Sequence, residues 1–130
     1  MNNAIQVVKE FLNAVQTGNQ AKLGELIHPG IKWHQGGNNR FSGTKNSSEE
    51  VFNMIGGMFE LTSNTLVLKN VEFIGSNKTD VACLLHFNAT KEGETLNSKN
   101  IDVYTVEYEK IVEVKVFIDD SQHEDNFWGK

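Results

Sequence analysis

The sequence has one cysteine, one proline and one arginine among its 130 residues, and it has no long apolar run. The lone Cys83 excludes an internal disulfide and favours a reducing compartment. Runs of a few apolar residues are too short to span a bilayer, and the first residues lack the basic and apolar regions of a secretion signal. We therefore expect a cytoplasmic protein without a membrane partner.

The charge distribution excludes two further classes of partner. The net charge is −5, the basic residues are scattered, and Arg40 is the single arginine. Binding to a phosphate backbone needs clustered Lys and Arg, so no nucleic-acid partner is expected. The histidines at positions 28, 34, 86 and 123 lack the spacing typical of metal ligands, so no metal site is expected.

The composition that is present is that of a globular chain, with 38% apolar and 22% charged residues. The length is close to that of a common domain and allows a sizeable core. There is no repeat, low-complexity stretch or linker, so we treat residues 1–130 as a single domain.

The first half of the chain has helical patterning. Apolar residues in 3–17 fall on one stripe at helical spacing, and Gly18 is suited to end that helix. Asn19 can cap a short second helix that ends at residues 28–30. Residues 47–50 have the Ser-x-x-Glu form of a capping box, which predicts a third helix with an apolar face that reaches residue 59.

The second half has strand patterning. Residues 65–74, 80–90, 95–108 and 111–119 are rich in β-branched and aromatic residues and are separated by turn-like pieces, so we expect antiparallel neighbours. Residues 31–35 predict a short extra strand followed by a loop over 36–43. The fold class is therefore α+β, with three N-terminal helices packed on a curved, mainly antiparallel sheet and a pocket between the layers.

Three segments carry a resemblance to a known family. They are LIHPGIKWHQGGNNRFSG (26–43), IDVYTVEYEKIVEVKVFIDD (101–120) and EFLNAVQTGN (10–19). With the order of elements, they resemble the SnoaL-like and ketosteroid-isomerase-like branch of the nuclear transport factor 2 (NTF2)-like superfamily. The resemblance implies a cone-shaped fold around a pocket, but this fold hosts several activities and also binding domains without catalysis.

Ketosteroid isomerase uses a carboxylate base together with a Tyr and a neutral Asp that bind the developing oxyanion. The resemblance places that neutral Asp at Asp102 and the base at His34, and it places Phe11, which has no hydroxyl, at the tyrosine. SnoaL-type cyclases use an aspartate as acid and base, which the resemblance places at Asp102 or at Asp119 and Asp120. Tyr104 could supply the hydrogen bond that Phe11 cannot.

Strand alternation suggests which side chains line the pocket. We expect Asp102 and Tyr104 to face it, together with the face of the preceding strand that carries Ala82, Leu84, His86 and Asn88. Phe127 and Trp128 either cover the pocket or anchor the C-terminus. The expected ligand contacts are Trp33, Gln35, Arg40, His86, Tyr104 and Ile118, with Trp33 also explained as core and Arg40 as a solvated side chain.

The opposite face of that preceding strand carries Val81, Leu85 and Phe87, which we expect to point outward. An exposed apolar face predicts a partner, and a homodimer through the sheet is the simplest one. Phe87→Asp should then dissociate the dimer.

Two functions are compatible with these residues. The first is a cofactor-free isomerase, cyclase or dehydratase in which His34, or an Asp of the last strand, takes a proton next to a carbonyl and protonated Asp102 stabilises the enolate. The second is a ligand-binding or dimerisation module without catalysis. Convergence of His34 and Asp102 in one pocket would favour the enzyme.

Overall fold

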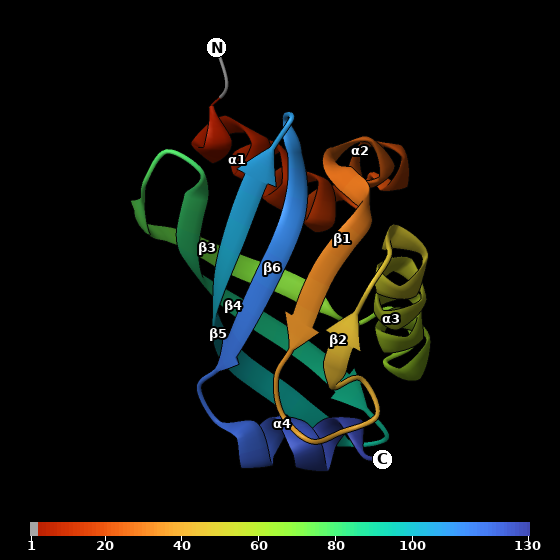
Figure 1. Cartoon of the computed structure of the whole chain (residues 1–130). Coiled ribbons are helices and arrows are strands. Elements are labelled where there is room, and N and C mark those ends of the chain that lie inside the picture. The colour runs from red at the N-terminus through yellow and green to blue at the C-terminus, as the bar shows by residue number, and fades with distance from the viewer. Residues whose placement is uncertain (1–2) are drawn as a thin grey trace.

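The structure is a computed structural model that describes residues 3–130, and it has the expected α+β class (Figure 1). Helices and strands follow in the order α1 (Ala4–Thr17), α2 (Gln20–Leu26), β1 (Ile27–Gln35), β2 (Gly43–Lys45), α3 (Ser48–Leu61), β3 (Val67–Ser76), β4 (Asp80–Lys91), β5 (Glu94–Glu107), β6 (Lys110–Ile118) and α4 (Ser121–Trp128).

The predicted helix ends are present. The Asn3 side chain accepts a hydrogen bond from the Gln6 amide, and Gly18, at φ 69°, ends α1 in the left-handed region. Ser47 caps α3 by accepting from the Glu50 amide, and the Glu50 carboxylate accepts from the Asn46 amide. These polar contacts satisfy amides that a helix start would otherwise leave unpaired.

The six strands form one mixed sheet in the order β2-β1-β6-β5-β4-β3. Strands β3 to β6 form the predicted antiparallel meander. Strand β1 pairs parallel with β6 and starts earlier than predicted, at Ile27, so that it runs through Pro29. The Pro29 ring removes one amide but does not stop the strand, because the register between β1 and β6 is interrupted between Ile27 and Lys32.

The sheet bends around the helices, as Figure 1 shows. Register shifts occur twice between β3 and β4 and once between β5 and β6, and such bulges increase the local twist. Helices α1 and α3 lie against the concave side, and the core between the layers includes Phe11, Val51 and Tyr104. Gly57 allows a close approach inside α3, because a Cβ there would lie 3.0 Å from the Phe41 ring.

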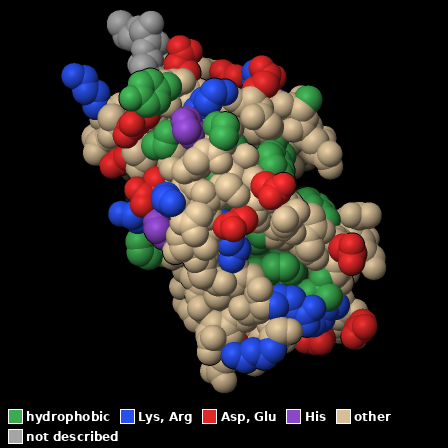
Figure 2. Space-filling model, turned by 45° about the vertical axis from the view of Figure 1, so that its right-hand side comes forward, with side chains coloured by type: hydrophobic (Ala, Val, Ile, Leu, Met, Phe, Trp, Pro, Cys, Tyr) green, Lys and Arg blue, Asp and Glu red, His purple; other side chains and the backbone are tan. Residues whose placement is uncertain are grey.

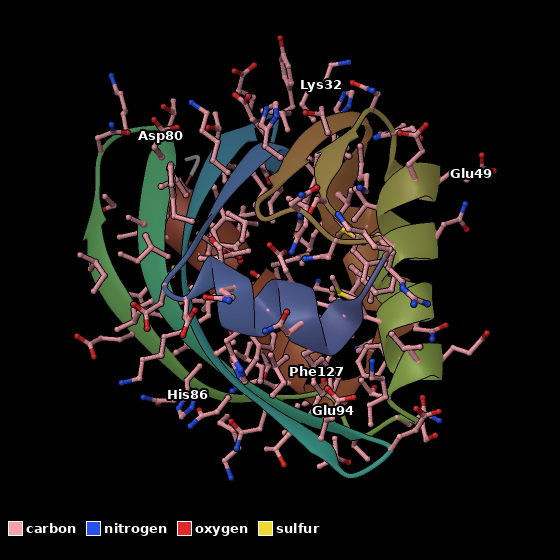
Figure 3. All side chains as sticks on the ribbon, turned by 90° about the horizontal axis from the view of Figure 1, so that it is seen from below. Lys32, Glu49, Asp80, His86, Glu94 and Phe127 are labelled. Carbon is pink, nitrogen blue, oxygen red and sulfur yellow. The ribbon has the colours of Figure 1, made fainter. Side chains whose placement is uncertain are left out.

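The C-terminal segment forms a fourth helix, α4, which the sequence did not predict. Helix α4 starts at the N-cap Asp120 and lies across the lower end of the curved sheet (Figures 1 and 3). Its Asp125 Oδ1 accepts from the Asn38 amide at 2.8 Å and from Asn39 Nδ2 at 2.9 Å, which ties the helix to the 36–43 loop. Phe127 and Trp128 are each only 2% exposed.

The predicted faces of β4 are inverted in the structure. Val81 and Leu85 are 1% exposed and belong to the core, whereas His86 lies on the outer side of the sheet (Figure 3). The wholly apolar set of alternating residues faces the helices because burying it removes the most apolar surface from water. The outward set predicted for a dimer, Val81, Leu85 and Phe87, is therefore directed into the protein.

Within residues 3–130, no helix combines the length and the apolar character that crossing a membrane requires.

Candidate active site

A cavity of about 1120 Å³ lies between the concave face of the sheet and helices α1, α3 and α4. Figure 2 shows a hollow on one side of the molecule with hydrophobic side chains gathered beside it. Most of the lining is apolar or aromatic, including Phe11, Leu12, Trp33, Phe52, Ile55, Met58, Leu85 and Val116. Such a lining suits an apolar small molecule.

Asp102 and Tyr104 lie on β5 with both side chains facing this cavity. They are 4% and 1% exposed, and the Tyr104 hydroxyl donates to Asp102 Oδ2 at 2.8 Å. The other oxygen, Oδ1, is buried and has no hydrogen-bond partner among residues 3–130. Asp102 therefore has one anchored oxygen and one that is free to meet a ligand.

The environment moves the pKa of Asp102 upward, to about 7 from an ordinary 3.8. Burial is the largest cause because a charged carboxylate loses its hydration, and the negative charge of Glu124 adds to it. The hydrogen bond from Tyr104 acts in the opposite direction. The pKa of Tyr104 is itself raised well above its usual value, mainly by burial, so that Tyr104 remains a donor.

A second polar pair lies on β1. Trp33 Nε1 donates to Gln35 Oε1 at 2.9 Å, and both side chains line the cavity. Trp33 is 7% exposed and also belongs to the core, so the two explanations predicted for it, core residue and cavity wall, hold together.

A buried carboxylate on α4, Glu124, was missed by the sequence analysis. It is 4% exposed and accepts from Trp128 Nε1 at 2.8 Å and from Ser98 Oγ. With its amide nitrogen turned towards them, Asn100 donates to Glu124 Oε2 at 3.2 Å and to Ser98 Oγ at 3.0 Å. The signal was the spacing of Glu124 and Trp128, four residues apart on one face of a helix, but it was hidden because the helix was not predicted.

His34 does not meet Asp102, so the convergence in one pocket that would have favoured His34 as a catalytic partner is absent among the described residues. Its Nε2 lies 2.8 Å from Glu113 Oε2 and its Nδ1 lies 3.0 Å from Thr44 Oγ1, and it is not part of the cavity lining. Side chains alternate along β1, so Trp33 and Gln35 face inward and His34 must face outward. This placement does not support His34 as the base.

The remaining predicted contacts also lie outside the cavity lining. Arg40 is exposed, and its backbone amide donates to Gly129 O at 2.8 Å. His86 Nε2 pairs with Asn97 Oδ1 on the outer side, and Ile118 packs beside the core. The alternative aspartates, Asp119 and Asp120, are both exposed at the start of α4.

Comparisons with known proteins agree with this architecture. The model of the SnoaL-like domain matches residues 8–114, so the chain belongs to the SnoaL-like family. A protein of unknown function with a cystatin-like fold from Xanthomonas campestris is 38% identical over 99% of this chain and 100% of its own, with a TM-score of 0.92. No curated protein matches.

Two more distant structures share the fold alone. An NTF2-like protein from Burkholderia xenovorans LB400 is 17% identical, covering 97% of this chain and 95% of its own with a TM-score of 0.82. IdmH, a putative polyketide cyclase from Streptomyces antibioticus, is 18% identical, covering 91% of this chain and 93% of its own with a TM-score of 0.76.

Proposed function

We propose that this protein is a cofactor-free enzyme of the isomerase, cyclase or dehydratase type. It transfers a proton from the carbon next to a carbonyl group of an apolar ligand. The observation that carries the proposal is Asp102, which is buried against the cavity, with Tyr104 on one oxygen and no hydrogen-bond partner from residues 3–130 on the other. A group that both takes and returns a proton works best when its pKa lies near the working pH, and burial brings the pKa of Asp102 to about 7.

In this proposal Asp102 serves as both base and acid. Its ionised form takes a proton from the carbon next to the carbonyl through Oδ1, and its protonated form then returns the proton to carbon or oxygen. The sequence predicted two separate groups instead, with His34 or an Asp of the last strand as the base and protonated Asp102 as the group that stabilises the enolate. The mostly apolar walls lower the local dielectric constant, which strengthens the electrostatic interactions of the few polar groups inside.

A structure with the same fold is in keeping with the proposal. IdmH is described as a putative polyketide cyclase. Cyclisation of a polyketide through a carbon–carbon bond proceeds by enolisation of a carbonyl compound. At 18% identity the likeness of IdmH to this chain extends to the fold alone, so the argument rests on Asp102 and the apolar cavity.

We also propose a homodimer through the outer face of the sheet, on a different set of residues from the one first predicted. Ile101 pairs with Leu84 on one side and with Phe117 on the other, which makes an apolar row across β4, β5 and β6. Ile101 is 42% and Phe117 is 56% exposed. Apolar residues gathered on one face favour association with a second copy.

The activity is tested by hydrogen–deuterium exchange at the α-carbon of 2-tetralone, an apolar bicyclic ketone, in heavy water followed by NMR. Asp102→Asn keeps the size of the side chain but removes its acid–base chemistry, so exchange should slow by about 10²–10⁴-fold. His34→Ala is the matched control, because it removes an ionisable group outside the cavity and should leave exchange unchanged. Binding of the ketone without exchange in the wild type would support the alternative, a binding module.

A further inference from the structure

Two aromatic side chains, Trp33 and Tyr104, lie on either side of Val114 in one row across three neighbouring strands. Tyr104 on β5 is the register partner of Val114 on β6, and Trp33 on β1 pairs with the same Val114 from the other side. Trp33 and Tyr104 therefore flank one small side chain and face the same cavity.

A second row, with polar side chains, lies beside the first one. Its members, Gln35 and Asp102, are two residues away from Trp33 and Tyr104 on the same strands. Asp102 is the register partner of Val116. On the other side, the last register pair between the parallel strands β1 and β6 is His34 with Lys115. Extending this register by one residue places Gln35, the last residue of β1, beside Val116. Gln35 and Asp102 thus stand on either side of Val116, and all three line the cavity.

Each polar group is held by the aromatic residue two positions away on its own strand. Tyr104 donates to Asp102 Oδ2 at 2.8 Å, and Trp33 Nε1 donates to Gln35 Oε1 at 2.9 Å. An indole N–H can only donate, so the Gln35 amide oxygen must face Trp33 and its Nε2 must face away. Neither Gln35 Nε2 nor Asp102 Oδ1 has a hydrogen-bond partner within residues 3–130.

We propose that Gln35 Nε2 donates a hydrogen bond to the carbonyl oxygen of the ligand and stabilises the enolate, and that Trp33 is the positioning residue that fixes this amide. The inference rests on the proposed function and adds the group that receives the charge which Asp102 creates. It also restricts the ligand to carbonyl compounds with an acidic C–H next to the carbonyl group. The carbonyl must lie over Val116, with that C–H directed at Asp102.

The spacing of the two strands is of the order that this arrangement needs. Two strand spacings separate β1 from β5, which is about 10 Å. A hydrogen bond to the carbonyl oxygen takes ~2.9 Å, the oxygen to the α-carbon ~2.4 Å, and the α-carbon to the base ~3 Å, together about 8 Å. The ligand occupies the space over Val116, between Gln35 and Asp102. The short valine side chain leaves this space open.

The chemical step balances without any added reagent. Asp102 Oδ1 takes the α-proton, the C–H electron pair forms a carbon–carbon double bond, and the carbonyl π pair moves onto oxygen. Gln35 donates to that oxygen as its negative charge grows, which is where a donor lowers the barrier most. Return of the proton from Asp102 to the same or another carbon regenerates the carboxylate.

The first test measures 2-tetralone exchange in single and double variants. Gln35→Met keeps the length of the side chain but removes the donor, and exchange should slow by about 10²-fold, the effect of losing one oxyanion donor. Trp33→Phe keeps an aromatic side chain but removes the indole N–H that holds the Gln35 amide, so exchange should slow by about tenfold with little change in KM. In the Gln35→Met background Trp33→Phe should add nothing, because the two residues act as one unit.

The second test measures binding and needs no turnover. Asp102→Asn resembles protonated Asp102, and 2-naphtholate resembles the enolate of 2-tetralone. We expect Gln35→Met in the Asp102→Asn background to weaken 2-naphtholate binding by 10-fold or more, as measured by fluorescence, with naphthalene binding unchanged as the control.

Unchanged exchange and unchanged 2-naphtholate affinity in Gln35→Met, with native thermal unfolding, would overturn the role of Gln35. If Gln35→Met fails to fold, the same two readouts in Trp33→Phe decide. The proposed function has its own contradicting result, which is an Asp102→Asn protein that exchanges as fast as the wild type. In that case 2-naphtholate binding still decides whether Gln35 binds an oxyanion.

Discussion

The Tyr104 hydroxyl donates a 2.8 Å hydrogen bond to Oδ2 of Asp102, two residues earlier on the same strand and on the same face of the sheet. The bond leaves only Oδ1 available to a ligand. It also counteracts part of the increase that burial causes in the pKa of Asp102. Tyr104 thus affects both the direction and the protonation of the group that we place at the centre of the chemistry.

Removing this hydrogen bond should raise the pKa of Asp102. Tyr104→Phe takes away a donor that favours the ionised carboxylate, so the acidic limb of the pH–rate profile for ketone exchange should move above the wild-type midpoint, which we expect near pH 7. The profile of exchange rate against pH checks this. A midpoint that stays in place or falls would show that Tyr104 does not stabilise the charged form.

Removing the charge of Glu124 should act in the opposite direction. Its negative charge raises the pKa of Asp102, so Glu124→Gln should move the same midpoint below the wild-type value. The variant also leaves one donor of Trp128, Ser98 or Asn100 without its acceptor, which should cost about 1–3 kcal/mol of unfolding free energy. Thermal unfolding measures that loss apart from the shift in the profile.

Asp102 should make stability depend on pH. Its pKa is raised from 3.8 in the unfolded chain to about 7 in the folded protein, so between these values the unfolded chain loses the proton while the folded protein keeps it. The contribution of Asp102 is therefore present below pH 4 and is lost as the pH rises to 7, by up to about 1.4 kcal/mol per unit.

Asp102→Asn removes this dependence and is the comparison. Relative to the wild type, the variant should gain stability steadily between pH 4 and pH 7 and no further above that range, as measured by urea unfolding at several pH values. A constant difference between the two proteins across this range would contradict a raised pKa.

The proposed dimer predicts that a charge on the outer face changes the oligomeric state. Phe117→Asp places a carboxylate in the row formed with Ile101 and Leu84, where burial without a partner is costly. Sedimentation at micromolar concentration should show twice the chain mass of 14.6 kDa for the wild type and a monomer for Phe117→Asp. Phe87→Asp is no longer a test of the dimer, because Phe87 faces the cavity.

Much of the fold could be predicted because its signals are local. Gly18 and Ser47 mark helix boundaries, and the turn between β4 and β5 has Glu92 and Gly93 at positive φ, as a tight hairpin requires. Helix α4 was missed because its short amphipathic pattern is weak, and most of its stability comes from packing Phe127 and Trp128 under the sheet.

The site was only partly predictable, because alternation defines two faces without saying which one is inside. The resemblance placed Asp102, and alternation placed Tyr104 with it. The polar atoms on the His86 face of β4 predict that this face lines the pocket, whereas in the structure the apolar face around Leu85 is the buried one. On β1 Trp33 is buried, so its neighbour His34 points to the outer face. Because side chains alternate along a strand, an error of one residue in the expected register exchanges the inner and outer positions.

The central claim is that Asp102 alone carries the proton, and α-hydrogen exchange of 2-tetralone at pH 7 in wild type, His34→Ala and Asp102→Asn tests it most directly. The account predicts that His34→Ala exchanges at the wild-type rate and that Asp102→Asn is slower by about 10²–10⁴-fold, the usual contribution of a positioned acid–base group, while 2-tetralone binding is retained. The account would be contradicted by an Asp102→Asn protein that exchanges at the wild-type rate, or by a His34→Ala protein that has lost the activity.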